Sequence, residues 1–224
     1  MHILQIKEGI HLVYKPVGPT SHDIVDLARK KSGIRRVGHT GTLDPFAEGL
    51  LIILVGKEYT RRQAEFLGMN KTYEAVIHLG ATSNTDDCTG TIFYDAYCTP
   101  ASLEDIQRVL TGFTGVHEQI PPLFSAKKIS GTPAYKLARK GQKPELKPKQ
   151  TTVYSIDLLS FEWPLLSIRT TVSSGTYIRA LARDIGEKLH CGAYCEKLKR
   201  TSIGSYLLTD AIRIPSESLC PRHE

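Results

Sequence analysis

The sequence contains no apolar run of the roughly 20 residues that a membrane-spanning helix requires. Its N-terminal stretch, MHILQIKEGIHLVYKP, lacks the layout of a signal peptide. The five cysteines form no CxxC pair, and their number is odd. We therefore expect neither a disulfide framework nor a structural zinc site. Together these absences predict a soluble, cytoplasmic protein without a metal ion.

No internal repeat or low-complexity block is present, and the 224 residues are enough to bury a substantial core. Lys and Arg outnumber Asp and Glu by 29 to 23. The excess gathers in three clusters, RKKSGIRR (29–36), KLARKGQKPELKPK (136–149) and KLKR, which ends at Arg200. A solvated helix face explains any one of them. Three clusters together favour a phosphate backbone as the partner.

Hydrophobic periodicity predicts a mixed order of helices and strands. We expect helices over 22–32 (capped by Ser21), 58–67, 103–111 and 176–190, with a short one near 133–140. Strands are expected over 9–14, 50–55, 71–79, 91–97, 151–160, 165–173 and 203–208. The six apolar residues 50–55 indicate a strand buried on both faces. The order shows no βαβ regularity, so we expect an α/β fold of the α+β type. Its mixed, largely antiparallel sheet would be flanked by helices.

The stretch GHTGTLDPFAEGLL (38–51) holds a single acid, Asp44, in front of this strand. Pro45 favours an extended backbone at Asp44. Asp–Pro turns are common, and such an Asp often only bonds nearby N–H groups. A carboxylate held this way can also attack an anomeric carbon. We find no clear second carboxylate to activate water, which favours an isomerisation in which the departing base reattacks the sugar.

Five segments in order resemble the pseudouridine synthases, specifically the TruB family of tRNA pseudouridine-55 synthases. GHTGTLDPFAEGLL is similar to the family's catalytic GHxGxLDPxAxGLL motif. The other four are LVYKPVGPTS, KTYEAVIHLGATSNTDDCTG, QIPPLFSAKKISGTPAYKLARKG and SSGTYIRALARDIGEKLHCGAY. They run from about residue 10 to 206 and so cover nearly the whole chain.

The resemblance implies an enzyme that converts a uridine of the tRNA T-loop to pseudouridine without a cofactor or metal. Asp44 matches the catalytic aspartate, which would attack the sugar, attack the base or remove a sugar proton. Tyr73 matches the tyrosine that stacks on the target base and helps to remove its C5 proton. Arg179 matches the arginine that pairs with the acid and lowers its pKa.

The resemblance also assigns residues to substrate binding. His39 matches a histidine that wedges into the T-loop where the flipped base has left, although a proton carrier was the other role open to it. Tyr177 and Leu198 match residues that line the uracil pocket, and a plain core role is equally open for Leu198. Lys15 fits the KP segment that supports the active-site loop.

The basic segment at about 120–150 matches the family's thumb, in which Lys128 would help to clamp the tRNA stem. Asp87 matches the acid of the family's loop at the SNTDD segment. Because the residues of this segment differ from the family pattern, the contacts of Asp87 stay open. Tyr14 stands where an Asp commonly precedes the KP pair. The implied domains are a catalytic domain over 1–210 and a short tail over 211–224, without the RNA-binding PUA domain of many relatives.

The expected partner is therefore the T-arm of tRNA, bound by a monomer that needs no protein partner and no membrane. Two alternatives remain open at this point. One is a pseudouridine synthase that acts on another RNA, including a guide-dependent one. The other is a tRNA-binding or tRNA-folding module without catalysis, although binding alone does not require Asp44, Tyr73 and Arg179 as a set.

Overall fold

The computed structural model describes residues 6–125, 128–129, 132–134, 137, 141–142 and 146–213. The chain forms two compact units. The first consists of Met1–Tyr73 and Leu198–Glu224, and the second of Glu74–Lys197. The chain passes from one unit to the other within strand β4 (Lys71–Leu79) and returns within strand β12 (Ala193–Ile203).

The first unit is built on strand β3 (Glu48–Val55). Strands β1 (Gly9–Lys15) and β2 (Val37–His39) both pair with β3 in antiparallel orientation. The second half of β12 pairs with it in parallel orientation, through Lys199 and Arg200. Two short strands complete this part of the sheet: β14 (Ile212–Arg213), parallel to β1, and β13 (Tyr206–Leu207), antiparallel to β12.

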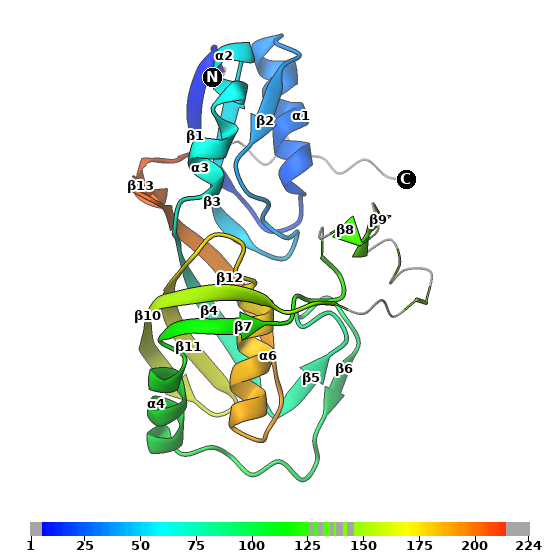
Figure 1. The fold of residues 1–224 in the computed structure, drawn as a ribbon, viewed down its shortest axis with the longest axis vertical. Coiled ribbons are helices and arrows are strands. Elements are labelled where there is room, and N and C mark those ends of the chain that lie inside the picture. Colours follow the sequence, from blue (N-terminus) through cyan, green and yellow to red (C-terminus); the bar gives the residue numbers. More distant parts are fainter. Residues whose placement is uncertain are drawn as a thin grey trace. The chain divides into compact units, whose positions relative to one another are not determined.

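Both faces of β3 are buried, as its apolar run predicted. One face packs against helix α1 (Ser21–Ser32), with Leu51, Ile53, Val55, Ile24 and Val25 in one cluster (Figure 1). The other face forms a second cluster of Leu50, Ile52, Leu54, Phe66 and Ile203. Each such side chain contributes about 1.5–3 kcal/mol when fully buried. A strand fixed from both sides gives the loop in front of it a rigid base.

Helix α1 confirms the predicted helix, but its cap lies one residue earlier than expected. The side chain of Thr20 accepts a hydrogen bond from Asp23 N (3.1 Å), and Asp23 Oδ2 accepts one from Thr20 N (2.7 Å). This capping box satisfies two backbone donors of the first turn. The assignment of the cap to Ser21 was therefore wrong, and the Ser21 hydroxyl is engaged elsewhere.

The helix expected over 58–67 is divided into α2 (Lys57–Arg61) and α3 (Gln63–Leu67). Arg62 separates them with φ −85° and ψ 7°, outside the ordinary helical values. Phe66 is the one residue buried in these two helices.

The second unit holds four neighbouring strands in the order β4, β11 (Leu165–Val172), β10 (Lys149–Glu162) and β7 (Gly115–Gln119). β10 pairs with β11 and with β7 in antiparallel orientation, so that β7 is the edge strand. β4 alternates strictly between buried and half-buried residues from Lys71 to Leu79, as the sequence predicted.

Helices α4 (Leu103–Gly112) and α6 (Ile178–Lys188) lie in the described part of the second unit, and α4 contacts both α6 and β10. Figure 1 shows α6 running alongside the strands of this unit. A Cβ added to Gly186 of α6 would lie 2.4 Å from the backbone N of Ala193, so only glycine permits this approach. The helix begins at Ile178, two residues after the predicted start, because the Thr176 hydroxyl bonds Ser173 and caps nothing.

The remaining elements are short. Strands β5 (Ala81–Ser83) and β6 (Ile92–Tyr94) form an antiparallel pair, as do β8 (Lys128–Ile129) and β9 (Thr132–Pro133). A 3-10 turn, η1, covers Leu208–Asp210. The strand expected over 203–208 was wrong, because β12 ends at Ile203 and β13 turns back on it. Most of the helix expected near 133–140 lies outside the described residues.

The predicted fold class is confirmed: the strands form a mixed, mostly antiparallel sheet accompanied by few helices. Within the described part of the chain, Cys88, Cys98, Cys191 and Cys195 form no disulfide bond. In that same part, no helix is both long enough and apolar enough to cross a membrane. The sequence predicted a catalytic domain over 1–210 with a thumb at about 120–150. These limits stay a prediction, because the two compact units divide the chain in another way.

Candidate active site

The backbone around Asp44 is held in place from several directions in the first unit. Leu43 exchanges two hydrogen bonds with the Ser21 hydroxyl, which accepts from Leu43 N (2.8 Å) and donates to Leu43 O (3.0 Å). Pro45 O accepts from Gly18 N (2.8 Å), and Asp44 O accepts from the backbone N–H of Ala47 (3.1 Å). The half-buried Asp44 is therefore carried by a loop with little freedom to move.

A buried arginine, Arg200, holds the start of the same loop. Its guanidinium donates to Gly41 O (3.1 Å), Thr42 O (3.4 Å) and Leu50 O (2.8 Å), and only 1% of the residue is exposed. Gly49 makes this approach possible, because a Cβ there would lie 2.3 Å from Arg200 O. The sequence suggested Arg200 as part of a phosphate-binding cluster. That interpretation was wrong, since a buried guanidinium that serves three carbonyls is not available to a phosphate.

Lys15 contacts the far end of the loop, and its role in supporting an active-site loop stays a prediction. Its ammonium is fully buried and donates to Ala47 O (2.7 Å) and Pro16 O (2.8 Å). Burial lowers the pKa of Lys15 to about 8, the Asp44 carboxylate opposes this shift, and the Arg200 charge adds to it. Asp44 thus lies in the field of two buried cations that are fixed by backbone carbonyls.

His39 ends β2, five residues before Asp44. Its backbone O accepts a hydrogen bond from the Gln63 side chain (2.7 Å). The ring Nδ1 is buried and has no hydrogen-bond partner among the described residues. Burial lowers the pKa of the His39 imidazole, and the charges of Arg200 and His22 lower it further. The ring is therefore neutral at neutral pH, which suits stacking better than a permanent positive charge.

Tyr73 and Leu198 lie on the neighbouring strands β4 and β12 of the first unit. Both are nearly buried, with 8% and 7% of their surfaces exposed. The Thr201 hydroxyl joins the two strands by donating to Thr72 O (3.2 Å). The role of Leu198 in the uracil pocket stays a prediction.

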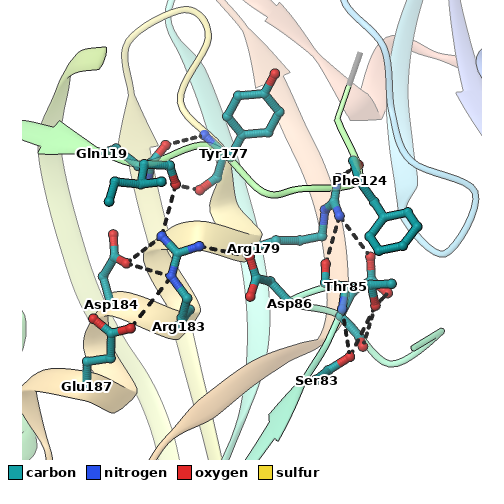
Figure 2. Close-up of polar contacts among 12 residues, drawn as sticks. Ser83, Thr85, Asp86, Gln119, Phe124, Tyr177, Arg179, Arg183, Asp184 and Glu187 are labelled. Carbon is teal, nitrogen blue, oxygen red and sulfur yellow. Dashed lines mark hydrogen bonds and ion pairs between the residues drawn. The ribbon is translucent and has the colours of Figure 1, made fainter. Parts of the chain in front are cut away.

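Arg179 belongs to the first turn of α6 in the second unit. Its guanidinium pairs with Asp87 Oδ2 at 3.2 Å, and the exposed fractions of the two side chains are 4% and 6%. It also donates to Thr85 O (2.9 Å) and Phe124 O (3.1 Å), as Figure 2 shows. Arg179 is therefore a fixed, nearly buried cation, joined to two loops. Its expected pairing with Asp44 stays a prediction.

Asp87 organises the loop that its own motif forms. Its Oδ1 accepts hydrogen bonds from the Thr85 hydroxyl (2.7 Å), Thr89 N (3.0 Å) and the Thr89 hydroxyl (2.6 Å). The preceding residue, Asp86, has a φ of 59°, a left-handed conformation that Asp tolerates better than most residues. With its other oxygen on Arg179, Asp87 links this turn to α6. Its proposed contact with RNA stays a prediction.

Tyr177 occupies the N-cap position of α6, and its side chain is half-buried. The side-chain amide of Gln119 donates to Tyr177 O (3.1 Å) and accepts from Tyr177 N (2.8 Å). One turn further along α6, Arg183 pairs with Asp86 (3.0 Å) and Asp184 (2.8 Å), and donates to the carbonyl of the residue after Gln119 (2.9 Å) (Figure 2). These contacts fix the end of α6 that carries Tyr177.

The side chain of Lys128, the remaining predicted contact, lies outside what the structure describes. The first unit places Lys15, the last residue of β1, close to the loop that carries Asp44. The second unit brings together Tyr177, Arg179 and Asp87 around the start of α6. Among the described residues, no group of three or more His, Cys, Asp or Glu side chains could hold a metal ion.

Sequence reasoning missed three residues that build these sites, namely Arg200, Gln119 and Arg183. Each acts on backbone carbonyls far away in the sequence, at separations of 150, 58 and 63 residues for Leu50, Tyr177 and Ile120. The quoted QIPP and KLKR segments contained two of them. The local sequence does not distinguish these buried side chains from exposed ones of the same type.

Residues 29–178 match the model of the TruB family pseudouridylate synthases, N-terminal domain. This is two thirds of the chain and contains the Asp44 loop as well as Tyr177. The chain belongs to this family. The family assignment drawn from the five sequence motifs is thereby confirmed.

Curated relatives agree with the match. The chain is similar to the tRNA pseudouridine synthase B of Protochlamydia amoebophila, with 42% identity over 92% of this chain and 78% of that protein. It is 41% identical to that of Chlamydia felis over 93% of this chain and 88% of the relative. The protein of Thermosipho melanesiensis is 47% identical over 91% of this chain, which spans 66% of the relative's length.

Two solved structures resemble the fold closely. One is a Cbf5–Nop10–Gar1 complex, with a TM-score of 0.73 and 29% identity over 96% of this chain and 55% of the matched chain. The other is an H/ACA RNP bound to a substrate RNA containing 2′-deoxyuridine, with a TM-score of 0.69 and 26% identity over 94% of this chain. This chain spans about half of each matched chain, 55% and 52%.

Proposed function

We propose that this protein converts uridine to pseudouridine at position 55 in the T-loop of tRNA, as the tRNA pseudouridine synthases B that it resembles are named to act on tRNA. One observation of the structure carries the proposal furthest. Asp44 is held on a loop whose backbone is bound by the side chains of Ser21, Lys15 and Arg200. Such preorganisation is what a catalytic group needs, because small displacements from the reactive geometry are costly.

The reaction is an isomerisation in which the sugar keeps its base. The bond between N1 of uracil and C1′ of the ribose breaks, the base turns, and a new bond forms between C5 and C1′. The proton on C5 is lost, and N1 gains one, so that no atom is added or removed overall. Asp44 enables this exchange by attacking the sugar or the base or by taking a sugar proton. No step requires an activated water or a cofactor.

Tyr73 and Arg179 complete the catalytic set of the proposal. Tyr73 stacks on the base and helps to remove the C5 proton. Arg179 supplies a positive charge to Asp44, which keeps the carboxylate ionised at neutral pH. Its burial and its fixed partners Asp87 and Thr85 support this role, because a guanidinium that is already oriented loses little freedom on pairing.

The target base is stacked inside the folded T-arm and must be flipped outward before any side chain reaches it. His39 then occupies the space that the base has left. A neutral ring there recovers part of the unstacking cost, on the order of 1–3 kcal/mol per stacked base. Tyr177 and Leu198 line the uracil pocket, and Lys15 supports the loop of the catalytic acid. Lys128 and the basic thumb hold the phosphates of the stem.

The remaining parts of the proposal follow from the substrate. We place the protein in the cytoplasm, where tRNA is modified, and expect a monomer that binds tRNA without a protein partner. The catalytic domain covers 1–210 with the thumb at about 120–150. Recognition uses the shape of the T-arm and its splayed bases, as is usual for structured RNA.

The test compares the protein with its Asp44→Asn variant on an unmodified tRNA transcript. Pseudouridine is mapped by carbodiimide labelling and primer extension, and tRNA binding is measured by filter retention. We expect a stop that reports position 55 with the unchanged protein, and no stop with Asp44→Asn although binding is largely kept. Asp157→Asn serves as the matched control, because Asp157 is an exposed acid on β10.

Each deviating result contradicts a defined part of the proposal. Full activity of Asp44→Asn would remove the assignment of the catalytic acid. Modification of a ribosomal or guide-paired RNA without modification of tRNA would replace the substrate. Binding of tRNA without any product would favour a folding module over an enzyme.

A further inference from the structure

The side chain of Gln119 is bound to the backbone of one distant residue through both ends of its amide. Its Oε1 accepts from Tyr177 N at 2.8 Å, and its Nε2 donates to Tyr177 O at 3.1 Å. Only 4% of Gln119 is exposed. The pair repeats the two-bond pattern of neighbouring antiparallel strands, with a side chain in place of the second strand.

This contact lies where α6 lacks a cap of its own. Tyr177 is the N-cap residue, and no side chain at that position bonds the first turn of the helix. The first N–H groups of a helix have no partner inside the helix and need one outside it. Gln119 supplies a partner at the N-cap residue itself, two positions before Arg179. A change at Gln119 therefore acts on the part of α6 that carries Tyr177 and Arg179.

Gln119 is also the last residue of the edge strand β7, directly before the segment that leads into the thumb. That segment contacts α6 twice more. Ile120 O accepts a hydrogen bond from Arg183 (2.9 Å), and Phe124 O accepts one from Arg179 (3.1 Å). Figure 2 shows the contact between Arg179 and Phe124. The root of the thumb and the start of α6 are thus joined at three points within six residues.

We propose that Gln119 is a positioning residue for the pseudouridine reaction, which sets the Tyr177–Arg179 turn through its two amide hydrogen bonds and ties that turn to the root of the thumb. The inference rests on the proposed function, because the residues that it positions act on the uridine. Gln119 itself touches neither the base nor the acid in this assignment. Its loss should therefore impair the chemical step more than the binding of tRNA.

The chemistry of the amide suggests a sharp test, the isosteric substitution Gln119→Glu. A protonated carboxyl group can do what the amide does, since it donates one O–H and offers one acceptor oxygen. An ionised carboxylate can only accept, so that one of its oxygens would face Tyr177 O without a proton between them. The variant is thus expected to regain the native arrangement when its new side chain is protonated.

The surroundings of Gln119 favour protonation of such a group. Burial raises the pKa of a carboxyl group, as it does for the nearby Asp86 and Asp184. Gln119 lines a cavity of about 480 Å³ together with His117, Glu118, Arg183, Asp184, Glu187 and Lys188. Arg183 already pairs with Asp86 and Asp184, so it offers little net positive charge to a new carboxylate. Lys188 is the other Lys or Arg among the residues that line the cavity, and His117, Glu118 and Glu187 are its further ionisable residues.

The experiment measures single-turnover pseudouridine formation and the Kd for tRNA of the unchanged protein, Gln119→Glu and Gln119→Leu between about pH 5.5 and 8.5, the range in which a raised carboxyl pKa titrates. We expect Gln119→Leu to be slower by about tenfold to a hundredfold at every pH, with a Kd within about threefold of the unchanged protein. The rate of Gln119→Glu, divided by that of the unchanged protein, should rise at least fivefold as the pH falls.

Gln107→Glu is the matched control, because Gln107 is an exposed residue on α4 of the same unit. Its rate ratio should stay flat with pH. Thermal unfolding of each variant is followed at the same pH values. If the activity ratio follows the folded fraction alone, or if the ratio of Gln119→Glu is flat with pH, Gln119 is only a structural residue and the inference is overturned.

The two hypotheses fail separately. If the unchanged protein forms no pseudouridine in tRNA, the proposed function fails before any variant is compared. If it is active and both Gln119 variants match it, the proposed function stands and the positioning role is rejected. A rise in Kd that accounts for the whole loss of rate would also reject that role, in favour of a contribution to tRNA binding.

Discussion

Ser21 and Leu43 lie 22 residues apart and exchange two hydrogen bonds, at 2.8 and 3.0 Å, through one buried hydroxyl. The hydroxyl thereby satisfies both backbone groups of the residue that precedes Asp44. Ser21→Ala would leave a buried N–H and a buried C=O without this partner. We expect it to lower the free energy of unfolding by about 1–3 kcal/mol. Urea denaturation followed by circular dichroism measures this.

The same substitution should reduce pseudouridine formation by about tenfold, because the Asp44 loop loses one of its attachments. Ser205→Ala, in an exposed turn, is the control and should change neither quantity. Equal stability of Ser21→Ala and Ser205→Ala would show that the hydroxyl contributes nothing to the loop.

Lys15 predicts a specific pH dependence of stability. Its pKa is about 8 in the folded protein, mainly because of burial, against an ordinary value of 10.5. Between these two values the unfolded chain binds more protons at this site than the folded one, so stability rises with pH. Below about pH 8 both states carry the proton, and burial of the charge opposes folding by a constant amount.

Comparison with Lys15→Met isolates this effect from other groups. The substitution removes the hydrogen bonds to Ala47 O and Pro16 O, which shifts stability by a constant amount. From pH 8 to pH 10.5 the unfolding free energy of the unchanged protein should therefore rise relative to that of Lys15→Met. Urea midpoints measured at intervals of pH provide the data. A difference that is constant over this range would contradict the lowered pKa.

Arg200 connects the geometry of the Asp44 loop to the charge of His39. Arg200→Met removes the donors to Gly41, Thr42 and Leu50, and we expect a loss of stability on the order of 3 kcal/mol. It also removes a positive charge that lowers the pKa of His39, so that pKa should rise.

Titration of the His39 ring by NMR tests this, with Arg200→Lys as the matched variant. Lysine keeps the charge but cannot serve three carbonyls, so activity should fall while the pKa of His39 stays low. An unchanged pKa of His39 in Arg200→Met would mean that Arg200 contributes nothing to the shift, which would then come from burial and His22.

Much of the framework was predictable from local patterns. The apolar run at 50–55 predicted a strand buried on both faces, and the alternation after Lys71 predicted β4 residue by residue. These predictions succeed because burial pattern follows directly from side-chain period. β12 was missed because Lys199 and Arg200 interrupt its apolar pattern, although Arg200 is buried.

The positions of the supporting side chains were not predictable in the same way. The preference of serine for N-caps predicted a cap at Ser21, whereas Thr20 forms the cap and Ser21 bonds Leu43. The side chains of Lys15 and Arg200 resembled ordinary surface cations until their carbonyl partners were known. Such contacts depend on which distant backbone groups lack a partner after folding, and the local sequence does not contain that information.

The two crossings of the chain between the units have a consequence during synthesis. The first unit consists of residues from both ends of the chain, and Arg200 reaches back 158 and 159 residues to Thr42 and Gly41. The loop of Asp44 therefore cannot be completed until the ribosome has released the segment beyond Leu198. A nascent chain that contains every motif up to the start of α6 still lacks Arg200, and with it the hydrogen bonds to Gly41 O and Thr42 O. The activity should consequently appear only after the segment that contains Arg200 has left the ribosome.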